Sequence, residues 1–158
     1  MSLNDVSGPP ASAEELDALS RLIDGWAATQ RDTNELVADV EVHPEDRRWI
    51  VRIRGEEKML VAVWLTLRER TLHFESQFMP APEENVAECY EYLLRSNRDL
   101  FAMRFAIGFE DAIYLVGQMP VRAIDESELD RILGSVYAYS ERYFRPAMSI
   151  GYRSKFKR

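Results

Sequence analysis

The chain has 158 residues, of which 46% are hydrophobic and 30% are charged, and its formal net charge is −7. This length and composition predict one soluble globular domain that is large enough to bury a hydrophobic core without disulfides or metals. No stretch reaches the roughly 18–20 consecutive apolar residues of a membrane span, and the acidic balance argues against nucleic-acid binding by the main surface.

The N-terminal segment and the cysteine content indicate the compartment. Residues 1–11 include the stretch SGPP and are predicted to be a flexible leader, because Gly, Pro and Ser favour irregular structure. They contain no basic region followed by an apolar one, so no secretory signal is visible. Cys89 is the single cysteine and cannot form an intrachain disulfide. Together these features favour the cytoplasm.

A helix and a strand are expected to follow this leader. Ser12 with Glu15 three residues later is a capping-box pattern, and apolar residues recur at helical spacing from there to about Gln30. Between residues 36 and 42 the apolar period changes to two. This alternation predicts a half-buried strand.

Hairpins are expected next in the chain. Residues 48–54 alternate apolar and polar side chains, residues 59–67 are almost continuously apolar, and the apolar residues of 72–78 continue the sheet up to Pro80. Proline cannot donate to a sheet ladder, so the strand is expected to stop there. The turns between these segments are polar and short, which favours antiparallel pairing.

The middle helix is predicted over residues 83–97. Its apolar stripe contains Val86, Tyr90, Leu93 and Leu94. Cys89 and Tyr92 widen that stripe beyond what one core-facing side needs, so these two residues are the candidate contacts of a homodimer.

The last third of the chain predicts a second hairpin and a final helix. Residues 102–109 alternate, an acidic turn follows, and residues 113–119 form the next strand. Asp125 with Glu128 is a helix-start signature, and Pro146 permits a kink or a stop near the end of that helix. The predicted class is therefore α+β, with three helices and about five mainly antiparallel strands in the order α-β-β-β-α-β-β-α.

Two blocks in this part of the chain, CYEYLLRSN and IYLVGQMPVRAIDESELDRIL, resemble the YbjN family, often called sensory transduction regulators. Members of that family are similar in fold to type III secretion chaperones. The resemblance implies a type III secretion chaperone-like fold for a single YbjN-like domain over residues 12–150. It also implies a homodimer that holds an extended segment of a partner protein. Residues 151–158 are then a basic C-terminal tail, typical of a solvated chain end.

No catalytic, cofactor or metal site is predicted. His43 and His73 lack the further ligands that a metal site needs. Cys89 lies on an apolar helix stripe, where a thiol is usually a small hydrophobe. The paired acids all fall at predicted turns or helix starts, and no nucleophile-elbow, P-loop or dinucleotide motif occurs. The sequence therefore predicts a protein that is not an enzyme.

The second face of the predicted sheet is the candidate binding surface. Alternation places apolar, aromatic and charged side chains on this face, among them Val37. The candidate binding residues are Ile50, Arg52, Trp64, His73, Arg104 and Tyr114. If this face is open, it suits a protein or peptide partner. The alternative is a sensor that binds an anionic metabolite in a pocket between sheet and helix around Trp64, Tyr114 and Arg104, with Arg104 as the orienting group. A covering helix or a second subunit would instead make the face structural.

Overall fold

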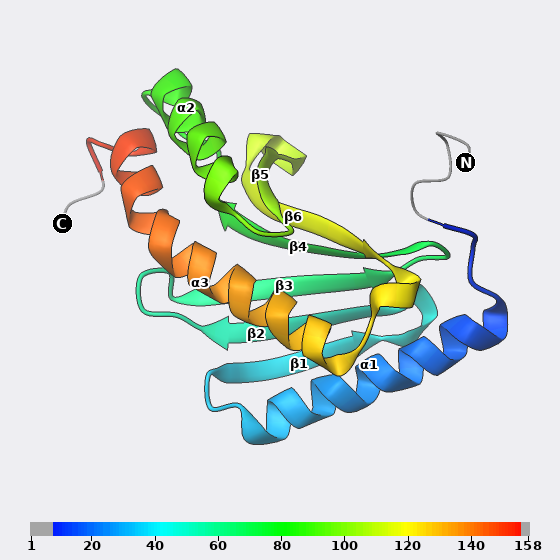
Figure 1. Cartoon of the computed structure of the whole chain (residues 1–158). Helices are drawn as coiled ribbons and strands as arrows, with labels where there is room; N and C mark the ends of the chain where they lie inside the picture. Colours follow the sequence, from blue (N-terminus) through cyan, green and yellow to red (C-terminus); the bar gives the residue numbers. More distant parts are fainter. Residues whose placement is uncertain (1–7, 156–158) are drawn as a thin grey trace.

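The computed structural model describes residues 8–155, in which three α-helices pack on one face of a six-stranded antiparallel sheet (Figure 1). The strand order is β1-β2-β3-β4-β6-β5. In chain order the elements are α1 Ala13–Thr33, β1 Val37–His43, β2 Arg48–Arg54, β3 Leu60–Leu67, β4 Thr71–Met79, α2 Val86–Ser96, β5 Arg104–Ile107, β6 Ile113–Pro120 and α3 Glu126–Gly151. The predicted α+β class is confirmed, but four strands rather than three precede α2. No helix in this part of the chain is long and apolar enough to cross a bilayer.

The helix starts form where the capping residues predict them. The Ser12 hydroxyl accepts a hydrogen bond from the backbone N–H of Glu15 at 3.1 Å, and the Asp125 carboxylate accepts one from Glu128 at 2.8 Å. At the other end of α3 the helix neither stops nor breaks at Pro146, but continues to Gly151. The apolar face of α3 therefore lies along the sheet over most of its length, next to β3 and β4 (Figure 1).

The core lies between the sheet and the helices, and two tryptophans tie these layers together. Trp49 of β2 donates its indole N–H to Asp24 of α1 at 2.8 Å, and Trp26 of α1 donates to Asp130 of α3 at the same distance. Both rings are buried. Each indole thus fills the apolar layer while its polar edge reaches a carboxylate at the surface.

A bulge in β1 overturns one prediction for the sheet faces. The pairing of β1 with β2 shifts between Val37 and Asp39, and Val37 pairs with Ile53. Val37 is consequently buried in the core and does not lie on the second face. Because side chains alternate with period two, one extra residue moves the neighbouring side chain to the other face. Simple alternation cannot reveal such a shift.

Glu141 of α3 anchors the hairpin between β2 and β3. Its carboxylate accepts hydrogen bonds from the backbone N–H groups of Glu56 at 3.1 Å, Glu57 at 2.8 Å and Lys58 at 3.4 Å. These N–H groups lie in the turn and have no hydrogen-bond partner in the sheet. The carboxylate accepts their hydrogen bonds in the way that an N-cap side chain accepts those of the first N–H groups of a helix.

Replacing Glu141 with alanine should lower the free energy of unfolding by about 1–2 kcal/mol, the range of a lost helix cap. Urea denaturation of the purified chain measures this change. Glu141→Gln is the matched comparison, since it keeps one acceptor and should lose less. Equal losses in the two variants would show that the acceptor is not what holds the hairpin.

Both ends of the described chain are attached to the domain. Ala11 donates its backbone N–H to the carbonyl of Glu69 at 2.7 Å, so the last residues of the predicted leader lie against the β3–β4 turn, whereas residues 1–7 lie outside the described part. At the other end, Arg153 pairs with Glu88 at 3.1 Å. The start of the basic tail therefore contacts α2, and residues 156–158 are again outside the described part.

Candidate functional site

The face of the sheet opposite the helices carries all six predicted binding residues. Strand register places Ile50, Trp64, Glu75, Val116 and Arg104 opposite one another in a single row that crosses β2, β3, β4, β6 and β5. The adjacent rows contain Arg52, His73 and Tyr114. Since all the helices pack on the other side (Figure 1), this face is not covered by any element of the described chain.

Ile50 and Arg52 contribute little free surface to this face. Ile50 is only 2% exposed although no helix lies above it. Arg52 donates to Asp39 at 2.9 Å and to Glu41 at 3.4 Å, which places an ion-pair network beside Ile50. The pKa of Glu41 is lowered by its contact with His43 and by Arg52. This corner is therefore closed by its own charged side chains.

Trp64, His73 and Arg104 come together in one depression, called here the sheet-face hollow. It measures about 240 Å³, and its polar lining together with Trp64 consists of Arg48, Trp64, Thr66, Arg68, His73, Glu75, Arg104 and Gln118. Trp64 is 38% exposed and has the Arg48 guanidinium 5.5 Å from its ring centroid. The hollow is on the open face of the sheet, so the prediction of a pocket between sheet and helix around these residues is wrong. Tyr114 is not part of the lining of the hollow.

The charges around the hollow act on His73. Partial burial lowers the pKa of the His73 imidazole, and Arg68 and Arg104 lower it further, while Glu75 raises it. Both arginines thus act on the same imidazole, Arg68 from the β3–β4 turn and Arg104 from β5.

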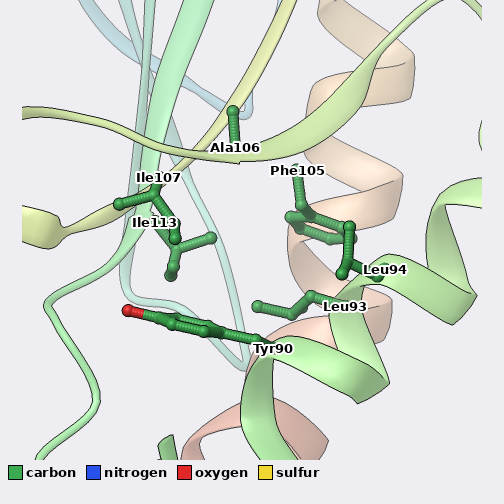
Figure 2. Close-up of a pocket in the computed structure, with 7 residues that line it drawn as sticks. All are labelled: Tyr90, Leu93, Leu94, Phe105, Ala106, Ile107 and Ile113. Atoms are coloured by element: carbon green, nitrogen blue, oxygen red, sulfur yellow. The ribbon is translucent and has the colours of Figure 1, made fainter. Parts of the chain in front are cut away.

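A second depression lies between α2 and the edge strand β5, and is called here the α2–β5 groove. Figure 2 shows Tyr90, Leu93 and Leu94 of α2 facing β5 and β6. The groove holds about 220 Å³, and the lining from the strands is Phe105, Ala106, Ile107 and Ile113. Leu94 is 68% and Ile107 54% exposed. Such a cluster of exposed apolar side chains is typical of an interaction surface.

The two predicted dimer contacts do not lie in this groove. Cys89 has no exposed surface, and its thiol lies 3.8 Å from the Ala147 carbonyl of α3, so it cannot contact a second copy of the chain. Burial raises the pKa of this thiol. Tyr92 is half-buried, with its ring 6.3 Å from that of Tyr143. Leu94, which the sequence placed on the core-facing stripe, is instead exposed.

Comparisons with known proteins identify relatives of this chain in mycobacteria. The chain is 35% identical over 109 residues to the uncharacterized protein Rv0487 of Mycobacterium tuberculosis, a match that covers 69% of this chain and 60% of that protein. The uncharacterized protein ML2442 of Mycobacterium leprae is 32% identical over 111 residues, covering 70% and 60% respectively. The matched region therefore spans about three fifths of the length of these relatives.

A solved structure has the same architecture. The Yersinia pestis type III secretion chaperone SycH, solved in complex with a stable fragment of YscM2, matches with a TM-score of 0.50 and 17% identity, over 77% of this chain and 96% of that one. At this identity the likeness shows the chaperone-like fold alone. The model of the YbjN family, described as "Putative bacterial sensory transduction regulator", matches residues 16–147. Since that match covers most of the chain, the protein belongs to the YbjN family.

Proposed function

We propose that this chain is a non-enzymatic, cytoplasmic regulatory or chaperone-like module that works as a homodimer and binds a partner protein on the open sheet face. The observation that carries the proposal is the exposure of Trp64 at the sheet-face hollow, beside the guanidinium groups of Arg48 and Arg104. Tryptophan and arginine are the side chains that most often supply the binding energy of protein interfaces.

The chemistry of the hollow supports binding rather than catalysis. Its three arginines stay charged and do not exchange protons near neutral pH. The thiol of Cys89 is buried and its pKa is raised, which is the opposite of an activated nucleophile. Within residues 8–155 no three His, Cys, Asp or Glu side chains are grouped to hold a metal ion.

The α2–β5 groove supports the homodimer. The β5 strand is at the edge of the sheet and is hydrogen-bonded to a neighbour on only one side in the described chain. An antiparallel edge strand can pair with its own copy across a two-fold axis, because such an interface brings the same surface of both subunits together. That pairing would also bring Leu94 and Ile107 of one copy next to the groove of the other. A second copy is therefore the occupant that we propose.

Capture of the partner should depend on the open face. We expect Trp64→Ala with Arg104→Ala to weaken binding by about 2 kcal/mol or more, which is a rise in Kd of roughly 30-fold or more. The partner is first cross-linked, identified and purified, and its affinity for the wild type and the variants is then measured by calorimetry.

Met59→Ala is the matched control, since Met59 is an exposed apolar residue in the β2–β3 hairpin, away from the hollow. It should leave the Kd unchanged. The exposure of Trp64 predicts that the double variant still unfolds cooperatively. Unchanged affinity in a folded double variant would exclude the open face as the binding surface.

A further inference from the structure

The sheet-face hollow gathers three guanidinium groups without a carboxylate partner in the described chain. Arg48 comes from β2, Arg68 from the β3–β4 turn and Arg104 from β5, and none of them forms an ion pair there. Other arginines of this acidic chain do pair, for example Arg52 with Asp39 at 2.9 Å. Three cations with one carboxylate beside them, Glu75, leave a local excess of positive charge.

Neutral and titratable hydrogen-bonding groups complete the lining. Thr66 and His73 lie opposite each other on β3 and β4, and His73 is opposite Gln118 of β6. The hydroxyl, imidazole and amide of these residues can each donate a hydrogen bond. Together with the guanidinium groups they form a set of donors around one small space, which an anion with several oxygens would satisfy.

The size and donor arrangement select the kind of anion. At about 240 Å³ the hollow is smaller than the roughly 300–1,000 Å³ of pockets for drug-sized ligands. A carboxylate presents two oxygens in one plane, whereas a phosphoryl group presents three strong acceptors pointing in different directions. Guanidinium groups match phosphate oxygens in pairs. The donors of the hollow come from β2, β4, β5 and the β3–β4 turn, so they approach from several directions and suit a phosphoryl group better than a carboxylate.

We propose that the sheet-face hollow binds the phosphoryl group of a small phosphate monoester, held by Arg48, Arg68 and Arg104 with His73 as a further donor. This site goes beyond the partner-binding function and does not depend on it, because the purified chain alone should bind the ligand.

A pH dependence follows from the surroundings of His73. The charged groups that face this imidazole are Arg48, Arg68, Arg104 and Glu75. Partial burial and the arginines lower its pKa, and a bound anion would stabilise the imidazolium and raise that pKa. For a phosphate of fixed charge, affinity should therefore be highest when His73 is protonated and should fall as the pH rises through the pKa of the complex. The second ionisation of the phosphate, with a pKa of about 6, acts in the opposite direction and is corrected for with the titration curve of the free ligand.

Proton NMR of the imidazole signals tests the site directly, because the chain has two histidines. His43→Gln assigns the two signals. Titration with glycerol phosphate or inorganic phosphate at millimolar concentration should move the His73 signal saturably and raise its pKa, while the His43 signal changes little. Succinate at equal ionic strength is the carboxylate comparison. Equal small shifts of both histidines, or saturable binding of succinate alone, would overturn the proposal.

Arginine variants locate the ligand. Arg68→Gln and Arg104→Gln should each raise the Kd for glycerol phosphate about tenfold or more, the range of a lost hydrogen bond between charged groups. Arg21→Gln removes the same charge from an exposed position of α1, on the other side of the sheet, and should leave the Kd within about twofold. If all three variants weaken binding equally, only general charge attraction is at work and the site does not exist. The outcome of these phosphate titrations does not alter the measured affinity for the partner protein. Each of the two proposals can therefore be overturned without the other.

Discussion

Trp49→Ala is expected to lower the free energy of unfolding by about 3–5 kcal/mol, the usual cost of removing a large aromatic side chain from a core. Trp49 is buried against the helices and its indole N–H donates to Asp24. The truncation leaves a cavity and also removes the link between β2 and α1. Because small domains are stable by only about 5–15 kcal/mol, the loss would be a large part of the total. Urea denaturation measures this loss, provided that the dependence of the unfolding free energy on urea concentration has the same slope in the variant and the wild type.

Trp64→Ala is the matched control for this prediction. Trp64 pairs with Ile50, the residue next to Trp49 in β2, so its side chain lies on the other face of the sheet. It is partly exposed, and its truncation should cost clearly less than that of Trp49. Similar losses in the two variants would mean that the open face is also covered, and would contradict the assignment of the two sheet faces.

Much of the fold could be predicted because local signals agree with the tertiary structure. The alternation in residues 48–54 placed Ile50 on the second face of the sheet; in the structure Ile50 pairs with Trp64 on that face, and its neighbour Trp49 is buried in the core. The capping residues Ser12 and Asp125 fix helix starts through short-range hydrogen bonds that depend little on the rest of the chain. Such signals identify elements and faces without any knowledge of how the strands pair.

The remaining features depend on long-range packing, which periodicity does not contain. The burial of Cys89 is set by α3, whose Ala147 carbonyl is 58 positions away in the sequence. The exposure of Leu94 arises because α2 packs beside α3 and leaves one side over the edge strand (Figure 2). Likewise, nothing local shows that β5 is at the edge of the sheet. The α2–β5 groove therefore could not be found from the sequence. Of the sheet-face hollow, the sequence identified Trp64, His73 and Arg104 as binding residues but not Arg48 or Arg68.

If the chain forms the proposed homodimer, Leu94→Glu combined with Ile107→Glu is expected to convert it into a monomer. Both side chains are exposed at the α2–β5 groove, so they can be replaced without removing buried core contacts. In a two-fold interface each substitution occurs twice, and four carboxylates would be placed in an apolar contact. Burying a charge without a partner costs several kcal/mol, which is enough to raise a micromolar dissociation constant well above millimolar. Light scattering coupled to size-exclusion chromatography measures the change in mass.

The choice of Leu94 matters because Tyr92, the contact that the apolar stripe suggested, packs against Tyr143, and Tyr92→Glu would disturb the fold as well as any interface. Met59→Glu adds an equivalent charge at an exposed apolar residue in the β2–β3 hairpin and should stay dimeric. The double variant should keep the melting behaviour expected of a folded domain, which thermal unfolding checks. A wild-type chain that is monomeric across the micromolar concentration range would rule out the proposed dimer. If instead the wild type is dimeric and the double variant remains so, the subunits associate through another surface, and the open sheet face becomes the first alternative.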